Sequence, residues 1–157
     1  MKLIESDHCR AHAKVIFEKW KPIIETSIPA SKVEHIGSTA VRGVLTKGDI
    51  DLYVEVAGDA HAAAVSTIEA MGFTVKPNTH RDAELCMLER SDVDNFALQV
   101  VAQGSKYRFF LEFRDALNSS NDLVEKYNAL KLSCSGNTPE QYRKHKSQFI
   151  MKVLNQL

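Results

Sequence analysis

Gly37-Ser38, ten intervening residues and then Asp49-Ile50-Asp51-Leu52-Tyr53-Val54-Glu55-Val56 form the stretch of sequence that decides the fold. Alternate side chains of a β-strand point to the same face, so the alternation from residue 49 predicts a strand with one apolar face. Its other face carries Asp49 and Asp51 together. Adjacent carboxylates repel each other unless a positive charge lies between them, which predicts a bound cation at this position.

The Gly37-Ser38 pair supplies the second half of this candidate site. It follows a predicted strand over residues 32–36 and precedes a predicted short helix or turn over residues 38–46. Glycine permits close approach of the backbone, and Ser38 with the following amides can hydrogen-bond a phosphate at a helix N-terminus. Mg²⁺ prefers oxygen ligands such as carboxylates and phosphates. The pattern therefore predicts a phosphate-binding turn next to a Mg²⁺ site.

Two sets of motifs resemble known families. Glycine-serine, a short helix and then two aspartates on a strand resemble the signature of the nucleotidyltransferase superfamily. More narrowly, Glu-His-Ile-Gly-Ser-Thr-Ala-Val at 34–41, with residues 47–52, resembles the GrpB family, nucleotidyltransferase-like proteins also found fused to dephospho-CoA kinase. Arg42 stands where that family usually has proline, and Gly48-Asp49 where it usually has Pro-Ile. The second departure gives this chain an aspartate pair that typical members lack.

The C-terminal half extends the GrpB resemblance over nearly the whole chain. Residues 113–117 resemble the family's F-R-D-x-L element, residues 127–131 its Y-x-x-L-K and residues 142–150 its Y-x-x-x-K-x-x-F-I ending. Tyr127–Lys131 and Tyr142–Lys146 are i, i+4 pairs, so each pair shares one helix face. Such a face could present an aromatic ring and a cation to a nucleotide, or bury the ring while the lysine reaches water.

Composition limits the class of protein. The chain has 157 residues, which predicts one domain over 1–157, and 44% of them are hydrophobic. Twenty basic and twenty acidic residues cancel, so net charge indicates neither nucleic acid nor an anionic membrane as a partner. The three cysteines lack zinc-like spacing and predict reduced thiols. Without an apolar signal segment at its N-terminus, the protein is expected to be cytoplasmic.

Hydrophobic periodicity predicts an α+β fold. We expect a twisted mixed sheet of about four or five strands with packed helices and a helical C-terminal part, as in nucleotidyltransferases. Asp7 is a candidate cap for the first helix, in which Pro22 is expected to cause a kink or an end. The predicted helices cover 7–26, 59–71, 106–117, 121–134 and 139–154, and the predicted strands 32–36, 49–56, 73–75, 84–90 and 95–102, the last two as a hairpin.

The resemblance implies a nucleotidyltransferase that uses Mg²⁺, or Mn²⁺, to move a nucleoside monophosphate from an NTP to an acceptor hydroxyl. Asp49 and Asp51 would be its catalytic, metal-binding residues. Each basic residue of the predicted phosphate site is also consistent with an ordinary packed or solvated side chain. The predicted nucleotide- and phosphate-binding residues are Gly37, Ser38, Thr39, Arg42, Lys47, Lys131 and His35.

A third carboxylate is expected on the strand over 95–102, and the sequence does not supply it there. The family resemblance predicts a His-x-His-like pattern, but Ala97-Leu98-Gln99 occupies these positions. Asp94 and Glu89 are the remaining candidates, and Gln99 could orient a substrate. This leaves two alternatives open: a non-catalytic module that binds a nucleotide or a CoA-like compound, and a protein-interaction accessory. The expected partner is an NTP, and RNA, a protein side chain or a small molecule could be the acceptor.

Overall fold

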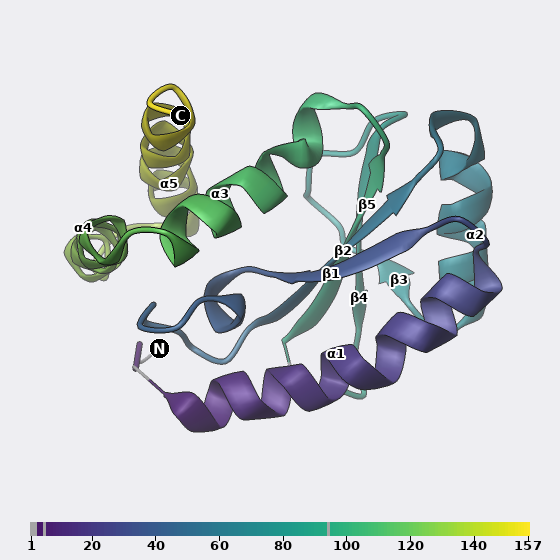
Figure 1. The fold of residues 1–157 in the computed structure, drawn as a ribbon, viewed down its shortest axis with the longest axis horizontal. Coiled ribbons are helices and arrows are strands. Elements are labelled where there is room, and N and C mark those ends of the chain that lie inside the picture. Colours follow the sequence, from purple (N-terminus) through teal and green to yellow (C-terminus); the bar gives the residue numbers. More distant parts are fainter. Residues whose placement is uncertain (1–2, 5, 94) are drawn as a thin grey trace.

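The computed structural model describes residues 3–4, 6–93 and 95–157, and a five-stranded mixed sheet forms its centre (Figure 1). The strand order is β1-β2-β5-β4-β3. Every neighbouring pair is antiparallel except β2 and β5, which are parallel and join the two halves of the sheet. The predicted α+β class is confirmed. The strands are β1 Lys32–Ile36, β2 Ile50–Val56, β3 Thr74–Val75, β4 Leu85–Arg90 and β5 Phe96–Ala102.

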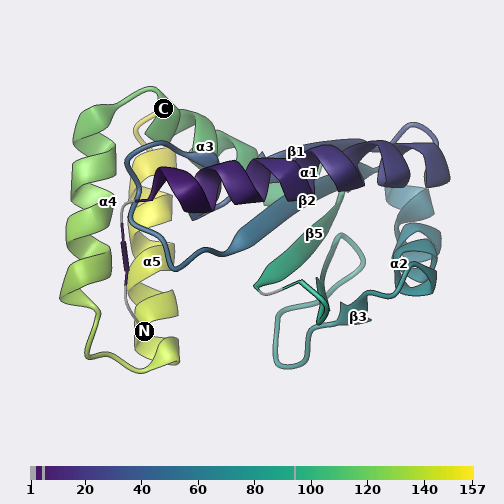
Figure 2. The ribbon, with the colours of Figure 1, turned by 90° about the horizontal axis from the view of Figure 1, so that it is seen from below.

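The helices cover the two faces of the sheet unequally (Figures 1 and 2). Two of them, α1 and α2, pack on one face, whereas α3 crosses the other and leads to α4 and α5, which lie beside one end of the sheet. The α-helices are α1 Asp7–Ser27, α2 His61–Ala70, α3 Phe109–Asn118, α4 Asn121–Ser133 and α5 Pro139–Leu154, and the 3₁₀ turns are η1 Ser38–Ala40, η2 Gly58–Ala60 and η3 Lys106–Arg108.

Alternation along β2 assigns its residues to the two faces as the sequence predicts. Leu52 and Val54 belong to the main apolar core, with Trp20 and Ile24 of α1. Tyr53 belongs to a separate cluster on the opposite face, with residues of η3 and α3. The side-chain period of a strand is two, so a single strand can serve an apolar core and a functional face at once.

Two local expectations need correction. The N-cap of α1 is Ser6, whose hydroxyl accepts a hydrogen bond from the amide of Cys9 at 3.1 Å, and Asp7 is the first helical residue. Pro22 does not end α1, which continues to Ser27, and the expected kink stays a prediction. The last helix begins as expected, because Thr138 and Gln141 form a capping box. Within the described residues, no helix is both long enough and apolar enough to span a membrane.

Candidate active site

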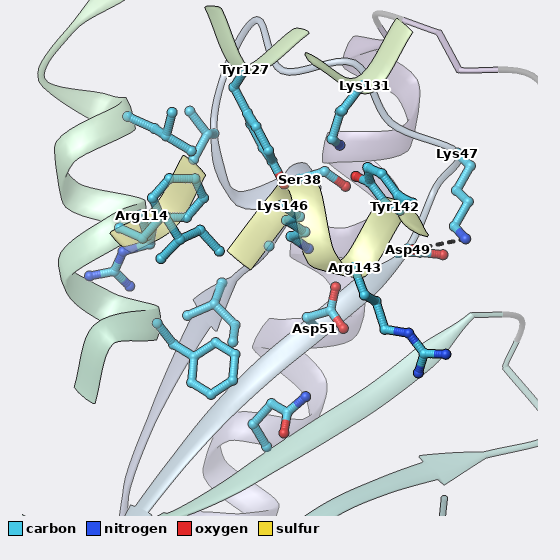
Figure 3. Close-up of a pocket in the computed structure, with 18 of the residues that line it drawn as sticks. Ser38, Lys47, Asp49, Asp51, Arg114, Tyr127, Lys131, Tyr142, Arg143 and Lys146 are labelled. Atoms are coloured by element: carbon cyan, nitrogen blue, oxygen red, sulfur yellow. Dashed lines mark ion pairs between the residues drawn. The ribbon is translucent and has the colours of Figure 1, made fainter. Parts of the chain in front are cut away.

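A cavity of about 680 Å³ lies between the open face of the sheet and the C-terminal helices (Figure 3). Its floor contains the Gly37-Ser38 turn, Asp51 of β2, and Asp49, which lies just before this strand and not within it as predicted. Helices α3, α4 and α5 form its walls. Figure 3 shows Tyr127 and Lys131 entering from α4, and Lys146 from α5. The volume lies within the range of small-molecule and cofactor sites.

Gly37 holds the turn directly against Asp51. Its φ is +80°, and a Cβ atom placed on it would lie 2.6 Å from Oδ2 of Asp51. Glycine is therefore required here both for its backbone conformation and for the close approach. The next side chain is fixed as well, since the hydroxyls of Ser38 and Thr46 are hydrogen-bonded at 2.8 Å. The two halves of the predicted motif meet in space.

Asp49 and Asp51 form a carboxylate pair that favours a cation. Burial, followed by the charge of Asp49, raises the pKa of Asp51 from 3.8 to about 6. One positive charge already lies near, because Nζ of Lys47 is 3.7 Å from Oδ2 of Asp49. A cation between the two carboxylates would remove their mutual repulsion, which is the second cause of the raised pKa after burial. Two carboxylates together with ligand phosphates are a usual ligand set for Mg²⁺, so these residues fit the ion.

Positive side chains from α4 and α5 line the opposite wall. Lys131 is only 7% exposed, and its Nζ donates to the carbonyl of Leu45 at 2.7 Å and lies 4.9 Å from the centre of the Tyr127 ring. Burial, followed by repulsion from Lys146, lowers the pKa of Lys131 to about 8. Arg143 and Lys146 complete this wall (Figure 3). None of these three cations forms an ion pair within the described part of the chain.

Aromatic rings supply the remaining surface of the cavity. Tyr127 stands edge-on to Phe113 at 5.3 Å between ring centres, and Phe109 stacks on Phe110 at 4.4 Å. Tyr142 faces the same space, and its burial raises its pKa to about 12, so its hydroxyl is protonated at neutral pH. Aromatic faces beside cations suit a nucleotide, whose base can stack while its phosphates meet the positive charges.

The structure brings six of the predicted site residues to this cavity and leaves three outside it. Those that line the cavity are Gly37, Ser38, Lys47, Asp49, Asp51 and Lys131. Arg42 is exposed and does not line the cavity, and the other two, His35 and Thr39, are engaged in packing and hydrogen bonds. A direct contact of these three with a bound phosphate in this cavity is not supported.

His35 and Thr39 instead fix the backbone at Asp49. The hydroxyl of Thr39 donates to the carbonyl of Asp49 at 2.8 Å, so its oxygen accepts from Nε2 of His35 at 3.0 Å. The ring of His35 stacks on Phe17 of α1, on the face away from the cavity. Burial, followed by the charge of Arg114, lowers the pKa of His35 to about 4. A neutral imidazole carrying its proton on Nε2 satisfies all these contacts.

Residues of α4 position the loop that leads to the aspartates. The amide side chain of Asn128 accepts from the backbone NH of Leu45 at 2.8 Å and donates to the carbonyl of Gly43 at 2.9 Å. Lys131 binds the carbonyl of Leu45 one helical turn later. The second element of the C-terminal motifs therefore joins two segments that are more than eighty residues apart. Sequence spacing indicates the shared helix face but not the loop it contacts.

The third carboxylate stays a prediction. Gln99 lines the cavity, and Ala97 pairs with Asp51 on one side and Glu89 on the other, so Glu89 lies on the same face two strands from Asp51. Asp94 lies outside the described residues. Among the residues that the structure describes, no group of three His, Cys, Asp or Glu side chains is placed to hold a metal ion.

Sequence reasoning alone missed several residues of the cavity. Arg143 lies on the same face of α5 as Tyr142 and Lys146, and Lys76 reaches the cavity from the segment between β3 and β4. Helical spacing could have indicated Arg143, which lies three residues before Lys146 of the motif. Nothing in the sequence marks Lys76, because the fold alone brings the β3–β4 segment to the aspartates.

Comparisons with known proteins show which sequences this chain resembles. A family model described as GrpB protein matches residues 6–156. A UPF0157 protein of Vibrio cholerae is 40% identical over 156 residues, which cover 99% of this chain and 83% of that protein. The glutamate-rich protein GrpB of Alkalihalophilus pseudofirmus is 27% identical over 92% of this chain and 90% of its own length.

Solved structures show the same fold. The conserved protein GrpB from Enterococcus faecalis has a TM-score of 0.77 at 20% identity and covers 99% of this chain and 96% of its own. Cid1, described as an RNA terminal uridylyl transferase, has a TM-score of 0.57 at 14% identity and covers 82% of this chain and 39% of its own. At such identities the likeness is one of fold, and the predicted nucleotidyltransferase-like architecture is confirmed.

Proposed function

This chain belongs to the GrpB family, and we propose that its cavity binds a nucleoside triphosphate with Mg²⁺ and transfers the nucleoside monophosphate to an acceptor hydroxyl. One observation carries this proposal: an aspartate pair packed against a glycine-serine turn faces, across one cavity, three cations that form no ion pair with any described residue. The turn and the aspartates alone would fit any divalent cation. The facing cations and the aromatic rings add the features that a triphosphate and its base need.

Asp49 and Asp51 would hold the metal ion. Mg²⁺ is usually bound by one or two carboxylates together with substrate phosphates, and Mn²⁺ accepts the same oxygen ligands. When bound, the ion would stabilise negative charge on the phosphates during an in-line displacement. The raised pKa of Asp51 supports this role in part: burial is its first cause, and repulsion from Asp49, which a cation would neutralise, is its second.

The remaining cavity residues orient the nucleotide. Lys131, Arg143 and Lys146 neutralise the phosphates from the side opposite the aspartates, and Arg143 can bind two phosphate oxygens at once. The rings of Tyr142 and Phe110 offer stacking surfaces for the base.

Thermal unfolding with each of the four NTPs, with and without Mg²⁺, tests this proposal. A ligand that binds only the folded state stabilises it by about 2.7 kcal/mol at a hundredfold excess over Kd. We expect a Mg²⁺-dependent shift that disappears in Asp49→Asn/Asp51→Asn. The matched control is Asp59→Asn, which removes an exposed carboxylate at η2. An unchanged shift in the double variant, or no shift with any NTP, would contradict the proposal.

A second candidate, nucleotide or CoA-like ligand binding without turnover, rests on Ala97 and Gln99. These residues take the positions on β5 where a third carboxylate is expected. Neither side chain can accept a proton from an attacking hydroxyl or bind a metal ion as strongly as a carboxylate does. This candidate gives the same thermal shift but no release of pyrophosphate. Pyrophosphate release that depends on Asp49 would exclude it. A protein-interaction accessory would give no nucleotide-dependent shift at all.

A further inference from the structure

A second cavity, of about 380 Å³, adjoins the first at the aspartates. It lies over the β2–β5–β4 part of the sheet and shares Asp49 and Asp51 with the first cavity. Its other walls include Glu89, Asn95 and Ala97. The small side chain of Ala97 separates Asp51 from Glu89 across the strands, so it leaves open space between the two carboxylates. Two cavities that meet at one metal-binding pair can hold two reactants in contact.

The cations of the second cavity are all paired with carboxylates. Besides Lys47, which pairs with Asp49, Nζ of Lys76 lies 3.7 Å from Oε2 of Glu89. The guanidinium of Arg90 is bound to the exposed carboxylate of Asp92 and also lies over the ring of Trp20. The charges of this cavity therefore compensate one another before any ligand enters.

The first cavity differs, because the three cations on α4 and α5 have no carboxylate partner among the described residues. A polyphosphate brings several negative charges and gains most from cations that are not already paired. A polyanion in the second cavity would instead have to break the Lys76–Glu89 pair and approach Glu89 itself. This contrast assigns the triphosphate to the first cavity.

Resting on the proposed function, we infer that the second cavity binds the acceptor, and that this acceptor is a small hydroxyl-bearing molecule without negative charge. Glu89 and Asn95 offer an acceptor oxygen and an amide to its hydroxyl or amino groups. A nucleic acid strand would need a continuous row of unpaired cations leading to the aspartates. The paired charges of this cavity do not provide such a row.

The transfer is a balanced displacement. The acceptor oxygen forms a bond to the α-phosphorus, and the bond from that phosphorus to the bridging oxygen of the β-phosphate breaks. Pyrophosphate leaves on the side of Arg143 and Lys146, and the hydroxyl proton passes to solvent. The attacking and leaving oxygens then lie on opposite sides of the phosphorus, as an in-line displacement requires.

Pyrophosphate release in the presence of NTP and Mg²⁺ tests this inference. Two acceptor sources are compared: total RNA, and a protein-free ultrafiltrate of a bacterial extract. The ultrafiltrate is separated on an anion exchanger into retained and unretained compounds. We expect the unretained compounds to stimulate release and RNA to have no effect. Glu89→Gln should reduce the stimulation about tenfold, the effect of one hydrogen bond to a charged group. Glu84→Gln, an exposed carboxylate just before β4, should behave as the native protein.

The outcomes separate the acceptor from the nucleotide. Stimulation by RNA or by the retained anions, or an equal response in Glu89→Gln, would overturn the inference. So would NTP binding with no stimulation by any source, which would favour ligand binding without turnover. The thermal shift with NTP and Mg²⁺ is expected to persist in Glu89→Gln, since this residue does not line the first cavity. Loss of the shift in this variant would assign Glu89 to the metal site as the third carboxylate and overturn its role in binding the acceptor. Loss of that shift in the native protein would instead remove the proposed function itself.

Discussion

The α1/α2 face of the sheet and its cavity face have different roles, although alternate residues of the same strands form both. On β2, Leu52 is fully buried in the main apolar core, whereas its neighbour Asp51 lies in the cavity with a raised pKa. Nε2 of His35 on the first face is hydrogen-bonded to Thr39, whereas Lys131 on the other side forms no ion pair with any residue that the structure describes. The first face therefore stabilises the fold, and the second keeps charges that a ligand can neutralise.

The largest loss of stability is expected from a substitution on the apolar α1/α2 face. Leu52→Ala should lower the free energy of unfolding by about 4 kcal/mol, because it removes a fully buried side chain from a packed core. Gln99→Ala, on the cavity face of the neighbouring strand, should lower it by less than about 1 kcal/mol. Urea denaturation of the two variants measures the difference. Equal losses would mean that the cavity face is as tightly packed as the core.

A smaller loss of stability is expected at Gly37, where the cavity face is closely packed. Gly37→Ala should cost about 2–3 kcal/mol, part of it from the positive φ and part from the contact with Asp51. Gly104→Ala is the matched control, because its φ is +79° but no atom lies within 4 Å of the added Cβ. The gap between the two variants in urea denaturation isolates the close contact. A gap of zero would show that the turn can move away from Asp51.

Asp51→Asn should stabilise the ligand-free protein by about 2–3 kcal/mol at pH 7 while abolishing Mg²⁺-dependent NTP binding. The folded-state pKa of about 6 lies above the ordinary 3.8, so the folded protein binds more protons between these values. The native protein therefore loses stability as pH rises through this window, and the gain from Asp51→Asn should vanish near pH 4. Thermal unfolding from pH 4 to 7 measures it, with Asp59→Asn as the neutral control. A gain that does not depend on pH would contradict this cause.

The smallest expected change in stability comes from Lys131→Met. Losing the hydrogen bond to Leu45 and removing a buried charge offset each other, so the free energy of unfolding should change by less than about 1 kcal/mol at pH 7. The folded-state pKa of about 8 lies below the ordinary 10.5, so the native protein gains stability as pH rises between them, and the variant should not. NTP binding should weaken about tenfold. Unchanged binding in a thermal-shift titration would assign Lys131 to the loop alone.

Motif and periodicity predicted much of this protein. The positions of the long helices and of the β4–β5 hairpin follow from hydrophobic spacing, and the sequence identifies Gly37, Ser38, Asp49 and Asp51 as one candidate site. The errors arose where local sequence does not fix the partner of a side chain. His35 alternates with apolar residues and could point either to a phosphate or into the fold, and only the position of α1 decides which.

By itself the sequence determined the α+β class, the family and the aspartate pair, because each of these depends on residue types at fixed short spacing. Tertiary structure alone decided that α4 and α5 complete the cavity. It also decided that Lys76, between β3 and β4, and Glu89 of β4 lie in one cavity with the aspartates, and that two differently charged cavities meet there. The reason is physical. The neighbours of a charged side chain in space decide whether its charge is compensated by the protein or available to a ligand. Those neighbours come from segments that the order of residues does not bring together.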